Sequence, residues 1–157
     1  MRDRIELRAR DAVASCLIRR LTVPRIYFEA AWPLAQNRVD VLAIDRDGVG
    51  DAHVVEIRQA ATDALASAVE LLKTTSPFRW IAFVRGTEDE ATALALTSEK
   101  GLYVPSAPGR IGIIEIVEIG ADLGANVRLA AERFPDAVYD VATSFSGSHK
   151  ANIQFGD

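Results

Sequence analysis

The chain has 157 residues, 49% of them hydrophobic, which is enough for one packed core and short for two ordinary domains. Its 18 basic and 22 acidic residues give a net charge of −4, which argues against a general polyanion binder. The single cysteine, Cys16, excludes an internal disulfide, and no apolar run reaches the roughly 18 residues of a membrane span, so we expect a cytoplasmic protein with no membrane partner.

The charge is distributed unevenly along the chain. The first 25 residues hold seven arginines against three acidic residues, a net charge of +4, whereas the rest of the chain carries −8. This asymmetry predicts either a local surface that faces phosphates, with Arg4 and Arg8 as nucleic-acid contacts, or an ordinary solvated helix face.

Residues 2 to about 20 predict an amphipathic helix that ends before Pro24, because apolar residues recur there at helical spacing. Glu6 falls within the apolar arc of this helix. A carboxylate that points toward a core needs a partner or a function. The predicted core face consists of Ile5, Ala9, Ala12, Val13, Cys16 and Leu17.

Three strands are predicted next, over residues 25–32, 38–45 and 52–58. These segments are rich in β-branched and aromatic residues, and turn signals separate them, namely Pro33 and the loop DRDGVGD. We expect the three strands to be antiparallel.

A second helix is predicted over residues 61–75, followed by a strand over 78–84. The run FRWIAFV is continuously apolar, which is typical of a central strand that is covered on both faces. The helix is long enough to cross from the third strand to a parallel neighbour.

The remaining elements are predicted as a helix over about 88–99, strands over 102–105 and 110–119, and a last helix over about 122–134 that stops before Pro135. The sequence thus predicts one α/β domain over residues 1–142, with a mixed central sheet flanked by helices, followed by a polar C-terminal segment over 143–157.

Two carboxylates lie inside predicted strands, where an ionised group is expensive. Strand alternation places Glu56 and Arg58 on one face of the third strand, and Asp40 lies in the second strand. In one strand register Asp40 and Glu56 converge, although the sequence does not fix that register. Converging carboxylates suit a hard divalent cation such as Mg²⁺, and the backbone carbonyl of Ile57 could add an oxygen ligand.

An acidic residue in the first helix, an Asp in the second strand and the motif Glu-x-basic in "VVEIR" together resemble the PD-(D/E)XK nuclease superfamily. The resemblance covers about residues 2–84 in the order α-β-β-β-α-β. It implies a restriction-endonuclease-like fold with a three-layer core. The later layout, with an extra hairpin after a third helix, is similar to that of small stand-alone members associated with DNA repair.

The resemblance implies a metal-dependent nuclease-like protein that acts on or binds nucleic acid, in DNA repair or processing, with Mg²⁺ or Mn²⁺ as its cofactor. Asp40 and Glu56 would be the metal-binding pair, joined by the Ile57 carbonyl. Glu6 would be the helix carboxylate that supports the metal's water shell, and Arg58 would stand at the position of the catalytic lysine.

Two residues depart from the family pattern. Arg58 replaces the lysine, and a guanidinium can stabilise phosphate charge but does not give up its proton near neutral pH. Glu70 and Thr74 stand where some branches have glutamine and tyrosine. Lys73 is a candidate for a displaced lysine, or it forms an ordinary surface pair with Glu70.

Three functional hypotheses follow. The first is a Mg²⁺-dependent phosphodiesterase. The second is a catalytically degenerate nuclease fold that serves as a nucleic-acid-binding or protein-interaction module, either as a homodimer or with another protein. The third is an unrelated α/β ligand-binding domain. The alternative to a metal site is an ion-pair network with Arg38 and Arg58.

His53 and His149 have no metal-ligand spacing to each other or to Cys16, so we expect both to be ordinary histidines. Trp32 and Trp80 lie in predicted strands, where we expect them to pack in the core.

Overall fold

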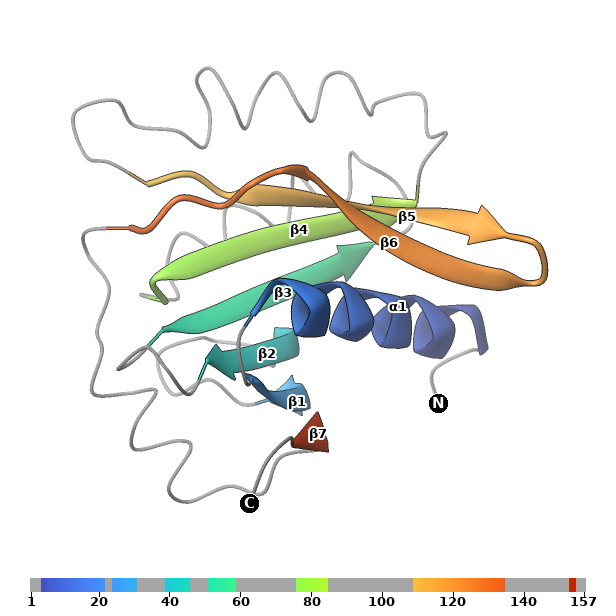
Figure 1. Cartoon of the computed structure of the whole chain (residues 1–157), viewed down its shortest axis with the longest axis horizontal. Helices are drawn as coiled ribbons and strands as arrows, with labels where there is room; N and C mark the ends of the chain where they lie inside the picture. The colour runs from blue at the N-terminus through green and yellow to red at the C-terminus, as the bar shows by residue number, and fades with distance from the viewer. Residues whose placement is uncertain are drawn as a thin grey trace.

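The computed structural model describes residues 4–21, 24–30, 39–45, 51–58, 76–84, 109–134 and 153–154. Within these ranges one helix packs against a seven-stranded mixed sheet with the strand order β6-β5-β4-β3-β2-β1-β7 (Figure 1). The chain is therefore a mixed α/β protein, as the sequence predicts. No helix in the described part of the chain is long and apolar enough to cross a membrane.

The first half of the described sheet is an antiparallel meander. Strands β1 (Pro24–Ala30), β2 (Val39–Asp45) and β3 (Ala52–Arg58) pair in sequence order, and the predicted strands and their antiparallel direction are confirmed. The short strand β7 (Ile153–Gln154), from the polar C-terminal segment, pairs with β1 at the edge of the sheet.

The centre of the sheet is parallel. Strand β4 (Phe78–Val84) runs parallel to β3, and β5 (Gly112–Ile119) runs parallel to β4. The apolar run of β4 is a central strand, as predicted, because Ile81, Ala82 and Phe83 are fully buried between these neighbours. The predicted segments 61–75, 88–99 and 102–105 lie outside the described residues.

The predicted last helix over 122–134 is wrong. Its first part is strand β6 (Asp122–Leu129), which pairs antiparallel with β5 through the two-residue turn Gly120–Ala121. Gly120 has a φ of 61°, a conformation that glycine adopts without strain. The segment DLGANVRL has apolar residues at every second position, so its true period is that of a strand; its alanine and leucine content favoured the helix reading.

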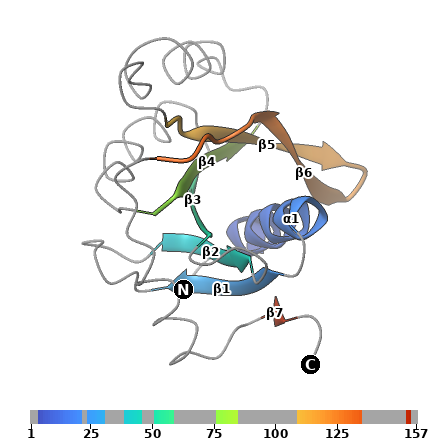
Figure 2. The ribbon, with the colours of Figure 1, turned by 60° about the vertical axis from the view of Figure 1, so that its left-hand side comes forward.

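Helix α1 (Arg4–Arg20) lies inside the curve of the sheet. Figure 2 shows it nearly end-on, with β5 and β6 on one side and β1 and β2 on the other. Its predicted core face is confirmed for every member whose side chain is described. Burial of such an apolar stripe is the main source of stability for an amphipathic helix. The buried members are Ala9, Ala12, Val13, Cys16 and Leu17.

The opposite face of the sheet is also buried at its centre. Leu42, Val54, Ile81, Phe83 and Ile113 alternate with the residues that contact α1, and all five are fully buried. Strand alternation therefore places the polar residues of this second face beside a dry apolar surface, and it is on this face that Asp40 and Glu56 lie.

Candidate functional site

The register of β2 and β3 brings Asp40 and Glu56 together. Val41 pairs with Val55, and the same register continued by one residue sets Asp40 opposite Glu56. Directly opposite residues of an antiparallel pair project from one face. The register that the sequence left open is therefore the one in which the two carboxylates converge.

Asp40 is a buried carboxylate that takes part in the backbone pairing of the sheet. Its residue is 6% exposed, and Oδ2 accepts a hydrogen bond of 2.7 Å from the backbone N–H of Ile57. This side chain thus satisfies a β3 donor just beyond the last paired residues of the two strands. Replacing it would leave that partly buried N–H without this acceptor.

Arg58 bonds to both carboxylates. Its Nη1 lies 3.1 Å from Asp40 Oδ2, and its Nη2 lies 3.1 Å from Glu56 Oε2. Nη1 also donates to the carbonyl of Ile57 at 2.6 Å. We call Asp40, Glu56 and Arg58 the carboxylate–arginine cluster. The ion-pair alternative predicted for Arg58 is present, with Asp40 as a partner from the adjacent strand.

Glu56 is held close to its neutral form. Burial, followed by the charge of Asp40, raises its pKa from 4.5 to about 7, and Arg58 offsets only part of this effect. A hydrogen bond between the two carboxyl groups favours the protonated form of Glu56 further. At neutral pH Glu56 is therefore close to the midpoint of its titration.

Each residue predicted to bind a metal has one oxygen in contact with Arg58. Asp40 Oδ2, Glu56 Oε2 and the Ile57 carbonyl all contact the Arg58 guanidinium. Within the described residues, no group of three or more acidic, histidine or cysteine side chains could hold a metal ion. A cation between the two carboxylates would have to displace Arg58 from these oxygens.

A third carboxylate, that of Glu29, lies next to Asp40 on the neighbouring strand β1. Glu29 falls between the pairs that β1 and β2 form on either side of Asp40, namely Phe28 with Val41 and Ala30 with Val39. Its φ of 51° is unusual for a residue other than glycine, and its side chain is exposed. The pairing of β1 with β2 is therefore locally irregular beside Asp40.

The other predicted carboxylates, the predicted lysine and Arg4 have side chains outside the described part of the structure. Glu6 and Arg4 belong to the first turn of α1, but their side chains are outside the described part of the structure. Helix α1 covers the face that carries Val55, which is opposite to the face of Glu56. Glu70 and Lys73 lie outside the described residues.

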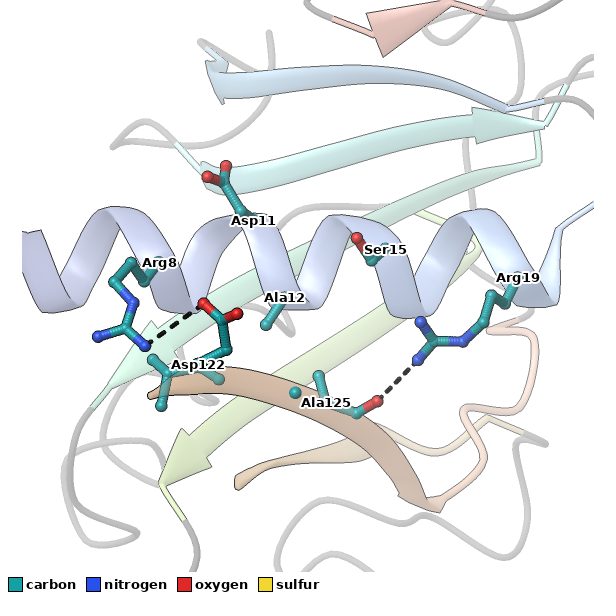
Figure 3. Close-up of a pocket in the computed structure, with 9 residues that line it drawn as sticks. Arg8, Asp11, Ala12, Ser15, Arg19, Asp122 and Ala125 are labelled. Carbon is teal, nitrogen blue, oxygen red and sulfur yellow. Dashed lines mark hydrogen bonds and ion pairs between the residues drawn. The ribbon is translucent and has the colours of Figure 1, made fainter. Parts of the chain in front are cut away.

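Arg8 contacts the protein itself. Figure 3 shows it at one end of a groove of about 310 Å³ between α1 and β6, with Arg19 at the other end. The Arg8 guanidinium donates to the carbonyl of Ala121 and lies 3.7 Å from an Asp122 oxygen. Arg19 donates to the carbonyl of Ala125 at 3.0 Å. Two helix arginines thus cap one carbonyl of the β5–β6 turn and one carbonyl of β6, the edge strand of the described sheet.

The other described arginines of α1 stack on aromatic rings. The guanidinium carbon of Arg10 lies 4.0 Å from the Phe28 ring centroid, and that of Arg20 lies 5.6 Å from the Trp80 ring centroid. Such contacts stabilise the helix against the sheet. The excess of positive charge near the N-terminus therefore has a structural explanation that does not require phosphate.

Sequence reasoning did not single out Glu115. This β5 residue is 5% exposed and pairs with Arg128 of β6 at 3.5 Å. It lies on the same face as Arg58, because Phe83 pairs with both residues in register. The signal was present in "GIIEIVEI", where an acidic residue interrupts an apolar strand as Glu56 does, but the strand of its partner was predicted as a helix.

Comparison with known proteins adds no family to this geometry. No protein-family model matches the sequence, and no curated protein matches it.

Proposed function

We propose that this chain is a catalytically degenerate nuclease-like domain that binds nucleic acid without cleaving it. The observation that carries the proposal is the position of Arg58, whose guanidinium contacts Asp40 and Glu56 at 3.1 Å each. A nuclease of the resembling superfamily would need a cation at that place and a lysine nearby. Here one arginine takes up both positions.

Turnover is disfavoured by the chemistry of this cluster. Arginine holds its proton at any physiological pH, so Arg58 cannot help to deprotonate an attacking water. Moving it aside for a metal would also break two contacts to largely buried carboxylates, whose side chains are 9% and 13% exposed. A hydrogen bond to a charged group contributes about 1.5–3 kcal/mol, and solvent at the partly exposed Arg58 side chain reduces this value.

Binding of a phosphate is compatible with the same geometry. The Arg58 side chain is 38% exposed, and its described hydrogen bonds and ion pairs go to Asp40, Glu56 and the Ile57 carbonyl. A guanidinium carries five N–H donors, so two remain for a phosphate oxygen. With Glu56 protonated, the cluster has no net charge and does not repel a polyanion.

Metal-dependent cleavage is the second candidate, and one observation favours it. The raised pKa of Glu56, which burial and Asp40 cause, shows that Arg58 does not fully relieve the crowding of the two carboxyl groups. A divalent cation that displaced Arg58 would relieve it more completely. This candidate predicts binding of Mn²⁺ that competes with the ion pair.

Fluorescence anisotropy tests the proposed function. Labelled single- and double-stranded DNA and RNA of about 20 nucleotides are titrated with the protein in EDTA at several salt concentrations. We expect binding that Arg58→Gln weakens several-fold. The matched control is Arg128→Gln, because Arg128 is also an exposed arginine that is paired with a buried glutamate.

The same samples are then incubated with Mg²⁺ and Mn²⁺ and examined for cleavage. Binding without cleavage is the expected result. Absence of binding to all four nucleic acids would overturn the proposal, and so would cleavage that Glu56→Ala abolishes. Equal weakening by Arg58→Gln and Arg128→Gln would show that phosphate binding does not involve the cluster.

A further inference from the structure

The hairpin of β5 and β6 projects beyond the rest of the described sheet (Figure 1). The last residue of β4, Val84, pairs with Ile116 of β5, and β5 then continues to Ile119 with β6 as its described neighbour. We call residues 118–122, which include the turn Gly120–Ala121, the hairpin tip. A hairpin of two strands is at best marginally stable in water by itself, so a projecting one gains from further contacts.

The hairpin tip exposes an apolar side chain. Ile119 is 62% exposed, and among the described residues the other exposed large hydrophobic residue is Leu7, at 37%. Leu7 precedes Arg8 in α1, and the Arg8 guanidinium contacts the carbonyl of Ala121 in the turn of the hairpin. The first turns of α1 and the hairpin tip therefore lie at the same end of the molecule (Figure 1). Both exposed apolar side chains belong to this end.

Two charged side chains near the groove between α1 and β6 form no ion pair within the described part of the chain. One is Glu118, which is exposed in the hairpin tip. The other is Arg19, whose described partner is the neutral carbonyl of Ala125. A guanidinium has five N–H donors, so Arg19 can bind a carboxylate and keep this contact. Arg19 is about 16 Å from the Arg8 end of the groove, where the hairpin tip lies, so the two charges do not meet within one molecule.

The groove between α1 and β6 has an apolar middle. Ala12 and Ala125 are both buried, and they lie between the two arginines that mark its ends (Figure 3). The exposed residues Asp11 and Ser15 line the groove from α1. Its volume of about 310 Å³ is at the lower limit of small-ligand sites, which is ample for one aliphatic side chain. The groove can therefore receive an apolar residue in its middle and a carboxylate at its Arg19 end.

We propose that two copies of this chain form a dimer by exchanging their hairpin tips, so that each tip lies in the α1–β6 groove of the other copy. With the two grooves antiparallel, the tip end of one copy meets the Arg19 end of the other. Ile119 then covers Ala12 and Ala125 of the second copy, and Glu118 pairs with Arg19 of the second copy. A two-fold axis relates the copies, so each contact occurs twice. This inference does not rest on the proposed function.

Charge complementarity selects a second copy as the occupant of the groove. An acidic peptide would neutralise Arg19 but would leave Ile119 and Glu118 exposed to solvent. A basic partner would neutralise Glu118 but would be repelled by Arg19. A second copy neutralises both charges and covers the exposed isoleucine at the same time, because the acidic tip and the basic groove end belong to the same chain.

Sedimentation equilibrium of the full chain tests the inference. The protein is measured from about 1 μM to about 1 mM, a range that covers dissociation constants of weak and moderate dimers. We expect a reversible equilibrium between monomer and dimer. A monomer at every concentration would overturn the inference.

Single substitutions then locate the interface. Ile119→Ser and Arg19→Glu are each expected to raise the dissociation constant at least tenfold, because each removes a contact that occurs twice. The matched control is Arg20→Glu, which makes the same change of charge at a helix arginine that lies over the Trp80 ring and not in the groove. Circular dichroism confirms that each variant folds. A dimer that neither Ile119→Ser nor Arg19→Glu weakens would overturn the inference, and so would equal weakening by Arg19→Glu and Arg20→Glu.

Charge reversal gives an independent check of the pair between copies. Glu118→Arg alone is expected to weaken the dimer as Arg19→Glu does, because two guanidiniums then face each other. When both substitutions are made in one chain, the pair forms again with its charges exchanged, and we expect the dissociation constant to return to within a few-fold of the natural value. A double variant that dimerises no better than either single variant would contradict the assignment of this pair.

Discussion

The two ends of β3 carry one buried titratable group each, on opposite faces of the sheet. At the start of the strand, His53 faces the α1 side and contacts Trp80 and Phe78, which are uncharged. Near its end, Glu56 faces the other side, between the carboxylate of Asp40 and the guanidinium of Arg58. Burial is the largest influence on both groups. It lowers the pKa of His53 to about 4 and raises that of Glu56 to about 7.

The comparison shows how burial and neighbouring charges together set the protonation state of each group. Burial disfavours the charged form of each group, and for His53 this leaves a neutral ring that needs no counterion. Glu56 is poised instead near neutral pH, because a positive and a negative neighbour act on it in opposite directions. The cluster end of the strand is therefore expected to change its protonation near neutral pH, whereas the His53 end stays in one protonation state.

The largest effect is expected when Asp40 is removed. Asp40→Ala takes away the acceptor of the Ile57 N–H and one partner of Arg58, so we expect a loss of about 1.5–3 kcal/mol in the free energy of unfolding. Asp40→Asn keeps an oxygen for Ile57 and is expected to lose about half as much. Urea denaturation measures both. A loss below about 1 kcal/mol for Asp40→Ala would show that the cluster does not stabilise the fold.

The pH dependence of stability should separate the two ends of the strand. A carboxyl group whose pKa is raised on folding binds more protons in the folded state, so its contribution to stability falls as the pH rises from 4.5 to about 7. A histidine whose pKa is lowered on folding gives a contribution that is present above 6.5 and is lost as the pH falls toward about 4. The two slopes oppose each other between these limits.

Glu56→Gln removes the contribution of Glu56 to the pH dependence of stability. Because a difference of one in pKa corresponds to about 1.4 kcal/mol, the shift of Glu56 from 4.5 to about 7 amounts to about 3 kcal/mol. We expect the variant to be more stable than the natural protein at pH 8 by about 1–3 kcal/mol. We also expect a steeper loss of stability below pH 6.5. Parallel pH profiles for the two proteins would contradict the assignment of the raised pKa to Glu56.

A moderate effect is expected at the other end of the strand. His53→Phe removes the acceptor of Trp80 Nε1–H, which should cost about 1–2 kcal/mol at pH 7. It should also abolish the loss of stability between pH 6.5 and 4 that His53 causes. Thermal denaturation at pH 7 and across the range from pH 6.5 to 4 measures both effects. His149→Phe is the control and should change neither.

The smallest effect is expected for the arginines that cap carbonyls of the β5–β6 turn and of β6. Arg8→Ala and Arg19→Ala remove partly exposed contacts to the Ala121 and Ala125 carbonyls, so each should cost less than about 1 kcal/mol. If nucleic acid binds, the salt dependence of its affinity should not change, because these guanidiniums already have partners. A reduced salt slope would revive the prediction that Arg8 contacts phosphate.

Local pattern was sufficient for much of this fold. The spacing of apolar residues predicts α1, and β-branched runs predict β1 to β5, because each of these elements buries one face or both. Strand β6 was missed, since alanine and leucine favour a helix in isolation and only the pairing with β5 decides for a strand. Alternation along DLGANVRL was the better signal.

The contacts of the candidate site were less accessible from the sequence. The motif in "VVEIR" predicts that Glu56 and Arg58 are neighbours, because alternation is a local property. That Arg58 also reaches Asp40 depends on the register between two strands, and the His53–Trp80 hydrogen bond depends on the parallel pairing of β3 and β4. Such contacts between strands are set by packing of the whole sheet, which one strand's sequence does not encode.

The central claim is that Arg58, bonded to both carboxylates of the carboxylate–arginine cluster, prevents cleavage. Its most direct test is metal-dependent cleavage by the natural protein and by Arg58→Lys. Both are assayed on single- and double-stranded DNA with Mg²⁺ and with Mn²⁺, and Glu56→Ala controls for contaminating nuclease. With Arg58 bonded to both carboxylates, we predict weak or no cleavage by the natural protein and at least a several-fold increase in Arg58→Lys. Robust cleavage by the natural protein that is lost in both Glu56→Ala and Arg58→Lys would contradict the account, because arginine would then be the working catalytic residue.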